Sequence, residues 1–334
     1  MKLYVTSPQQ LDKQGINSKP IMSYLYKNGL VVEADPLPSS PEFLRQKILA
    51  ELSAEVSSVV IIGNHQVIPF FPLDNPTVDS DAEVWSDNPY ACLYDDFLLP
   101  DYPISRIPSD PHNPLFLWDY LENCKVEVEV SQKVFGISAH SWKNASREVF
   151  SLFPDKHKQL LFSPPLIRLS LPVHLVESNY TYRYFNVHGS KHTHLWYGQQ
   201  GSNYPEVLSS EDIIDQKGVV VISEACYGGW LAKRGKKNSI AMKFLLSGAS
   251  LFLGSTTISY GPSYPPSEEA DLICGCFVQQ LRKQIPAATA LLKAREEFIN
   301  LTVSRQGYLD DDDRKSLYQF VLYGNPDIIV KERF

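Results

Sequence analysis

The sequence predicts an α/β fold built around a mostly parallel β-sheet. Continuous apolar runs such as "VSSVVIIGN" (56–64) and "GVVVIS" (218–223) are typical of strands that are buried on both faces. Segments with apolar residues at helical spacing lie between such runs. A series that alternates in this way forms βαβ units, in which the strands run parallel.

Residues 1–112 are expected to form a smaller N-terminal α/β subdomain. The expected strands are 2–7, 30–34 and 56–64, and the expected helices are 19–29 and 39–55. The second of these helices begins with a Ser cap and has a proline near its first turn. Residues 72–112 are rich in Pro, Asp and Ser, so we expect long loops with short elements there.

A bridging helix and linker (113–130, with the helix at 114–124) are expected to lead into a second subdomain at 131–334. Its expected strands are 133–138, 165–171, 183–188, 218–223 and 249–255, with a final strand pair around 318–330. Its expected helices lie around 145–153 and at 238–248, 267–283 and 287–301. The acidic run "DDDDR" (310–314) is interpreted as a solvated loop.

Composition excludes several classes of protein. A net charge of −7 argues against a nucleic-acid partner, which requires clustered Lys and Arg. No apolar run approaches the ~18 residues of a membrane span, so no membrane partner is expected. The first residues lack the apolar core of a signal peptide, and five scattered cysteines do not form a disulfide framework. We therefore expect a cytoplasmic protein.

Two predicted strands end in residues that can carry chemistry. His188 follows "RYFNV" and Cys226 follows "VVVIS", and parallel strands present their carboxyl ends at one edge of a sheet. A nearby imidazole raises the nucleophilic fraction of a thiol. The backbone amides of Gly189 and Cys226 could stabilise an oxyanion, and Gly228 and Gly229 are expected to leave room for a substrate backbone.

Two other interpretations of these residues stay open. A cysteine after a buried strand is often an inert packing residue. His188, His192 and His194 with Glu224 could also bind zinc, although their spacing fits no regular element well.

Six segments in the same order resemble the gingipain-like cysteine peptidases, which share the caspase fold with caspases, legumain, clostripain and separase. The segments are "VVIIGNHQVIPFF", "SDNPYACLYDDFLLPDYPISRIPS", "FNVHGS", "ISEACYGG", "LFLGSTTISYG" and "VLYGNPDIIV". The chain departs from the family pattern at Ser105, where the family has Gly, and at Asn325, where it has Asp.

The resemblance implies a caspase-like three-layer αβα fold and a His188–Cys226 dyad. It places the oxyanion hole at the backbone amides of Gly189 and Cys226. The family's acidic partner of the histidine would fall near His140, and Glu224 is a second candidate for this third role. No cofactor is required, although some relatives carry calcium in acidic loops. The loops that would form the S1 pocket contain Trp142, Lys143, Asn144, Arg147 and Tyr260.

The predicted function is therefore a cysteine endopeptidase that cleaves protein or peptide substrates through a thioester. The alternatives are a transpeptidase, an inactive binding scaffold of the same fold and, less favoured, a His-ligated metal hydrolase. Without an evident carboxylate in the S1 loops, no strong preference for Arg or Lys is expected at P1. The basic loop 231–239 ("LAKRGKKNS") is expected at the rim of the site, where a regulatory protein could act on it or a protease could cut it.

Overall fold

The fold is organised around one ten-stranded sheet. The structure is a computed structural model that describes residues 1–38, 40–130, 133–154, 157–172, 180–231 and 239–332. In spatial order the strands are β2 (Gly29–Glu33), β1 (Lys2–Thr6), β3 (Ser58–Ile62), β6 (Ile104–Ile107), β15 (Phe320–Gly324), β14 (Leu251–Ser255), β13 (Val220–Ser223), β10 (Tyr182–Asn186), β8 (Lys133–Ala139) and β9 (His157–Ser163). Every neighbouring pair is parallel except β14 with β15. The strands on the two sides of that junction therefore have their carboxyl ends at opposite edges of the sheet.

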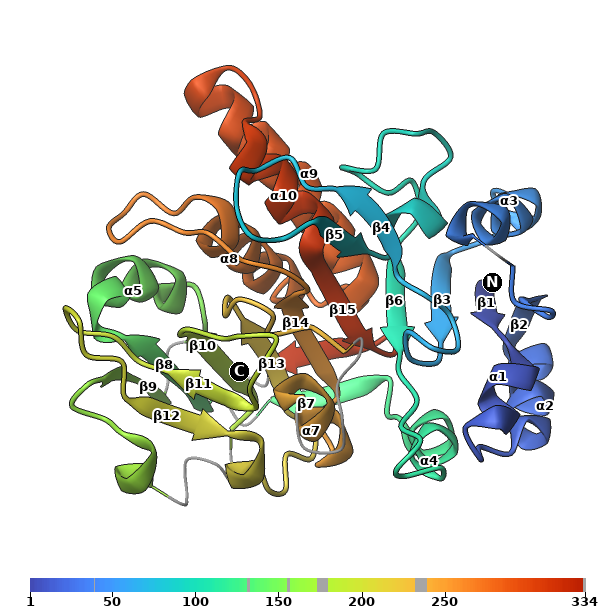
Figure 1. The fold of residues 1–334 in the computed structure, drawn as a ribbon, viewed down its shortest axis with the longest axis horizontal. Helices are drawn as coiled ribbons and strands as arrows, with labels where there is room; N and C mark the ends of the chain where they lie inside the picture. Colours follow the sequence, from blue (N-terminus) through green and yellow to red (C-terminus); the bar gives the residue numbers. More distant parts are fainter. Residues whose placement is uncertain (39, 131–132, 155–156, 173–179, 232–238, 333–334) are drawn as a thin grey trace.

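Helices cover both faces of the sheet, which confirms the predicted three layers (Figure 1). One core lies between strands β8, β10, β13, β14 and β15 and the helices α5 (Lys143–Ser151), α8 (Glu269–Leu281), α9 (Ala287–Gln306) and α10 (Asp311–Gln319). On the opposite face, a second core contains α7 (Ile240–Leu246), the hairpin of β11 (Leu195–Tyr197) and β12 (Glu206–Ser209), and the start of α4 (Phe116–Asn123). A third core contains α1 (Pro8–Lys13), α2 (Ser18–Asn28) and α3 (Pro41–Glu51) with β1, β3 and β6.

Alternation along β13 decides which side chains reach which core. Val220 and Ile222 pack in the core with α8, whereas Val221 packs in the core with α7. The next even-numbered residue, Glu224, therefore points toward α8, and Ala225 points toward α7. The direction of the strand therefore decides on which face of the sheet each side chain after β13 lies.

Most predicted strands and helices are present within a few residues of their expected bounds, but two predictions were wrong. The strand expected at 165–171 lies earlier, at β9, and Leu169 within the predicted range is 95% exposed. The "DDDDR" run starts helix α10, because Asp310 caps it and forms a reciprocal capping box with Asp313.

The segment 72–112 was expected to hold long loops with short elements, and two of these elements form a hairpin whose position was not predicted. Strands β4 (Phe71–Asp74) and β5 (Glu83–Ser86) form an antiparallel hairpin. Because β3 runs opposite to β13, a hairpin that turns back after β3 carries its tip, residues 75–82, to the carboxyl end of β13 (Figure 1). Residues that appeared to be loop thus reach the edge where His188 and Cys226 lie.

Arg106, in the segment "SRIPS" (105–109), holds two parts of the chain together. The Arg106 guanidinium forms a bidentate ion pair with Asp87 at 2.6 and 2.9 Å and donates to the Gly63 and Ile68 carbonyls. Both side chains of the pair are buried, so this ion pair ties β6 to the segment after β5.

The expected bridging segment, residues 113–130, contains α4. Four strands of the large sheet come from residues 1–112 and six come from residues 131–334. Within the bridging segment, β7 (Glu127–Val130) pairs with the last strand, β16 (Ile329–Glu332). None of the helices in the described parts of the chain is long and apolar enough to cross a membrane.

Candidate active site

His188 and Cys226 lie at the same edge of the sheet, just beyond two neighbouring strands. Strands β10 and β13 pair in parallel, with Phe185 opposite Ser223. Gly189 lies directly against the turn at Cys226, because a Cβ atom at this position would be 2.2 Å from the Cys226 carbonyl oxygen. A glycine is therefore required at 189 to bring the two strand ends this close.

The turn after Cys226 is fixed by its neighbour β14. The Tyr227 amide donates to the Thr257 carbonyl at 2.9 Å, and the Gly229 amide donates to the Ser255 carbonyl at 2.7 Å. Tyr227 adopts a left-handed φ of 55°, which is uncommon for a residue with a bulky side chain. The turn thus continues the pairing of β13 with β14 beyond the regular strands.

The two glycines of this turn do not leave room for a substrate backbone, so that expectation was wrong. A Cβ atom at Gly229 would lie 2.6 Å from the Gly254 carbonyl oxygen. At Gly228 it would lie 2.7 Å from the Ser223 hydroxyl and 2.9 Å from the Ala225 carbonyl. The space is occupied by the protein's own chain, and the glycines allow the turn to pack against it.

The Cys226 thiol lies against the backbone of Ser259. The Ser259 amide donates to Sγ at 3.3 Å, and Sγ lies 3.4 Å from the Ser259 carbonyl oxygen. Burial raises the pKa of the Cys226 thiol, and the Ser259 amide opposes this effect because its N–H stabilises a thiolate. The thiol is therefore protonated at neutral pH before substrate binds.

The imidazole of His188 is held by Gln199. Nε2 of His188 lies 2.9 Å from Oε1 of Gln199, whose amide nitrogen donates to the Tyr204 hydroxyl at 2.9 Å and to the Gly201 carbonyl at 3.2 Å. Because the Gln199 nitrogen is used in this way, its oxygen accepts and Nε2 of His188 carries the proton. The tautomer that results leaves Nδ1 free to act as a base.

Aromatic rings enclose this imidazole. The Trp142 ring lies 4.4 Å from the His188 ring, and the Tyr204 ring lies 5.2 Å from it. Burial lowers the pKa of His188, while the hydrogen bond to Gln199 raises it and compensates only in part. The imidazole is therefore neutral at neutral pH. No hydrogen bond joins it to the thiol among the described residues.

The structure does not bring either predicted third residue to His188. Glu224 points into the core, where it accepts a hydrogen bond from the Tyr184 hydroxyl at 2.9 Å. Burial and the nearby Asp271 carboxylate raise the pKa of Glu224 well above its ordinary value, so it is protonated. Nδ1 of His140 lies 3.1 Å from the Pro164 carbonyl oxygen instead.

Gln199 occupies the position that those two residues were expected to fill, and the sequence held no signal for it. It lies beyond β11 in an irregular loop. Its backbone N–H donates to the Ser163 carbonyl at 3.0 Å, and its backbone carbonyl accepts from the Ser141 backbone amide at 3.0 Å. This placement depends on tertiary contacts of the Gln199 loop with the end of β9 and with the short helix 140–142.

The expected S1 residues fall into different environments. Trp142 borders His188, and Lys143 and Asn144 are half-buried at the start of α5. Arg147 is exposed, with its guanidinium 5.1 Å from the Phe162 ring. Tyr260 is not a free pocket wall, because its hydroxyl donates to Asp79 at 2.6 Å.

The backbone amides expected to form the oxyanion hole are available. Within the described ranges, the N–H groups of Gly189 and Cys226 donate no hydrogen bond to another residue. Both belong to the strand ends that meet at this edge. They therefore remain candidates to bind a developing oxyanion.

The zinc interpretation does not fit the side chains. His188 contacts Gln199, whereas Glu224 lies on the α8 side of the sheet. Among the described residues, no group of three or more His, Cys, Asp or Glu side chains is arranged to hold a metal ion. Calcium stays a prediction from the resemblance.

Four basic residues of the predicted regulatory loop lie outside the described residues. They are Lys233, Arg234, Lys236 and Lys237.

Comparisons with known proteins agree with this arrangement. Residues 179–331, which include His188 and Cys226, match the family model of peptidase family C25. A search of curated proteins found no match.

Two solved structures similar to this chain are gingipains. The complex of the pro- and mature domains of RgpB from Porphyromonas gingivalis superposes with a TM-score of 0.69 at 12% identity, covering 99% of this chain and 80% of that one. The Arg-specific cysteine proteinase gingipain R gives a TM-score of 0.69 at 13% identity, covering 99% of this chain and 78% of that one.

A complex of separase with securin from Saccharomyces cerevisiae is also similar. It gives a TM-score of 0.50 at 15% identity, covering 84% of this chain and 16% of that one. The fold implied by the resemblance is thus confirmed: the chain has the caspase-like αβα fold of these proteins, and its residues 179–331 match peptidase family C25.

Proposed function

We propose that the chain is a cysteine endopeptidase in which Cys226 is the nucleophile and His188 the general base and acid. The observation that carries the proposal is the meeting of two parallel strand ends, where Gly189 lies against the carbonyl of Cys226. Gln199 supports it by leaving Nδ1 of His188 unprotonated. Both residues also lie within the segment that matches family C25.

The proposed reaction starts from a neutral thiol and a neutral imidazole. His188 takes the thiol proton as Sγ bonds to the substrate carbonyl carbon. The amides of Gly189 and Cys226 bind the oxyanion. When the C–N bond breaks, His188 returns the proton to the leaving amine and a thioester remains. Water then gives a proton to His188 and attacks the thioester, and the thiol leaves with that proton.

The proposed substrates are proteins or peptides. The similar structures include a pro-domain complex and a separase–securin complex, so proteins of this fold bind polypeptide partners. We also propose that a regulatory protein acts on loop 231–239, whose four basic residues favour an acidic partner. All five cysteines are free, which agrees with the proposed cytoplasmic location.

Replacement of the two proposed catalytic residues tests this function. Cys226→Ala and His188→Ala should each lower kcat/KM on a diverse peptide library by about 10³-fold or more, without loss of fold. Cys124→Ala is the matched control, because Cys124 is also half-buried but lies far from the sheet edge that holds the site. Wild-type turnover by Cys226→Ala would exclude the proposal.

The same assay separates hydrolysis from transpeptidation. Both reactions pass through the thioester, and they differ in whether water or an amine attacks it. Product analysis with an added amine nucleophile should yield mainly the free acid. A dominant amide product would instead identify the transpeptidase.

A further inference from the structure

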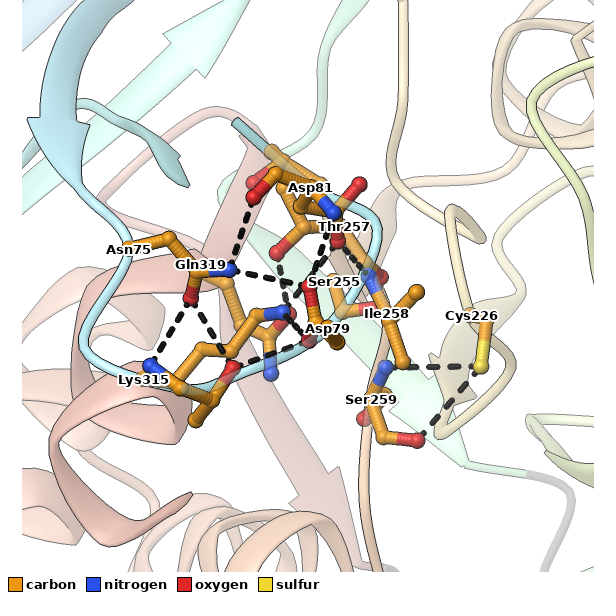
Figure 2. Close-up of polar contacts among 12 residues, drawn as sticks. Asn75, Asp79, Asp81, Cys226, Ser255, Thr257, Ile258, Ser259, Lys315 and Gln319 are labelled. Carbon is orange, nitrogen blue, oxygen red and sulfur yellow. Dashed lines mark hydrogen bonds and ion pairs between the residues drawn. The ribbon is translucent and has the colours of Figure 1, made fainter. Parts of the chain in front are cut away.

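The carboxylate of Asp81 binds two segments at the proposed site, the turn after Cys226 and the segment whose Ser259 contacts the thiol. Asp81, at the tip of the β4–β5 hairpin, accepts a hydrogen bond from the hydroxyl of Tyr227, the residue after Cys226. It also accepts one at 2.8 Å from the amide of Ile258, the residue before Ser259 (Figure 2). Since the Ser259 amide donates to Sγ, Asp81 holds both the nucleophile turn and the segment that contacts the thiol.

A buried lysine neutralises this carboxylate. Lys315 of α10 is fully buried, and its ammonium group donates to Asp79 and, at 3.2 Å, to Asp81. Asp79 in turn accepts from the Tyr260 hydroxyl at 2.6 Å, so Ser259 is held from both sides. Lys191, two residues after Gly189, lies 3.8 Å from Asp81. The cluster thus contacts every strand end that forms the site.

The hairpin tip is shaped to present these carboxylates. The Asn75 side chain donates to Asp79 and to the Asp81 carbonyl, both at 2.9 Å. The Thr77 hydroxyl donates to Asp79 at 2.9 Å. Burial disfavours the charge of Asp79, but the hydrogen bonds from Lys315 and Tyr260 outweigh burial and lower its pKa. The tip therefore stays charged at neutral pH and paired with Lys315.

We propose that Asp81, with Lys315 as its counter-ion, is a positioning residue for the nucleophile: it fixes Tyr227 and Ile258 so that the Ser259 amide meets Sγ. The inference rests on the proposed function and assigns a task to an N-terminal hairpin that contributes no catalytic residue. Asp81 itself does not contact the thiol.

The charge of Asp81 and its positioning role have opposite effects on the thiol. As a nearby negative charge, Asp81 raises the pKa of Cys226, so its removal alone would make the thiol more acidic. As the anchor of Ile258, it maintains the Ser259 N–H contact, which lowers that pKa. The direction of the change in a variant therefore distinguishes the two roles.

The test compares Asp81→Asn with wild type in two assays. The first is the pH dependence of iodoacetamide alkylation of Cys226, followed by mass spectrometry of its peptide, which needs no peptidase activity. The second is peptide hydrolysis. We expect the alkylation midpoint to move to higher pH and kcat to fall about 10-fold or more, with KM within about twofold. Asp74→Asn, an exposed carboxylate on the same hairpin, should match wild type in both assays.

Tyr227→Phe provides a second variant that changes no charge and removes only the hydroxyl that donates to Asp81. It should shift the alkylation midpoint in the same direction by a smaller amount, and it decides the question if Asp81→Asn does not fold. A midpoint that falls or stays unchanged in the folded variants would overturn the positioning role. Absence of peptide hydrolysis by wild type would refute the proposed function instead, while the alkylation assay would still decide this inference.

Discussion

An amide, not a carboxylate, orients the imidazole of His188. A carboxylate would stabilise the imidazolium ion and favour a thiolate–imidazolium pair at rest. Gln199 fixes the tautomer without adding charge, and burial then keeps both the imidazole and the thiol neutral. In the proposed mechanism, the proton therefore passes from the thiol to the imidazole only after substrate has bound.

The charge of residue 199 should determine the pH below which kcat/KM falls. The pKa of His188 is lowered, and only the unprotonated imidazole can accept the thiol proton, so kcat/KM of wild type should fall only below about pH 6.5. In Gln199→Glu the added carboxylate raises the pKa of His188, and activity should be lost at higher pH than in wild type. Gln199→Ala should lower kcat/KM about 10- to 100-fold at neutral pH.

Gln200→Glu is the matched control for this prediction. It adds the same charge one residue later, on an exposed side chain. Its acid limb should remain close to that of wild type, because exposed charges are screened by solvent and salt. An equal shift in both Glu variants would contradict a direct contact between residue 199 and the imidazole.

At the scale of elements, the sequence predicted the features of the site that follow from strand direction. It did not predict those that depend on how the loops pack. Continuous apolar runs identified β10 and β13, and the parallel rule then placed His188 and Cys226 at one edge. Short elements were expected in 72–112, but the β4–β5 hairpin could not be located among them, since each of its strands has only four residues and the tip contains Pro and Asp. The contact of Gln199 with His188 depends on the packing of one loop against the end of β9 and a short helix, and no local sequence pattern encodes this packing.

The packing of the residue that follows β13 against α8 should make the free energy of unfolding depend on pH. Glu224, directly after β13, and Asp271 of α8 are buried together, and burial raises the pKa of both, that of Asp271 to about 6. The folded state therefore holds a proton on Glu224 that the unfolded state releases above its ordinary pKa. The resulting stabilisation is present at low pH and is lost as the pH rises toward the folded pKa.

Glu224→Gln should remove this dependence, because its amide is neutral at every pH. Its thermal midpoint should match wild type near pH 4 and exceed it at pH 8 by about 2–4 °C, the shift that ~1 kcal/mol produces in a large domain. Differential scanning calorimetry at both pH values checks this. The exposed Glu83→Gln should show no such divergence, and a Glu224→Gln protein less stable than wild type at pH 8 would disprove the raised pKa of Glu224 in the folded state.

For the whole molecule, the antiparallel junction of β14 with β15 explains why the N-terminal half is part of the site. It reverses the strand direction midway through the sheet, so the hairpin after β3 returns to the edge that holds Cys226. The same arrangement makes β15 an internal strand that depends on β6 from residues 1–112. The two halves are therefore joined by backbone pairing and by the buried cluster of Lys315 with Asp79 and Asp81.

The C-terminal half alone should therefore not form a soluble and active protein. In a fragment of residues 113–334, β15 would present an unpaired edge and Lys315 would be left as a buried cation without its carboxylates, which costs several kcal/mol. We expect this fragment to aggregate or to lack peptidase activity. The full chain cut at an engineered protease site in the exposed segment 111–115 should instead elute as one species on size-exclusion chromatography and retain activity. A soluble 113–334 fragment with wild-type kcat/KM would show that the hairpin and its carboxylates contribute nothing to the site.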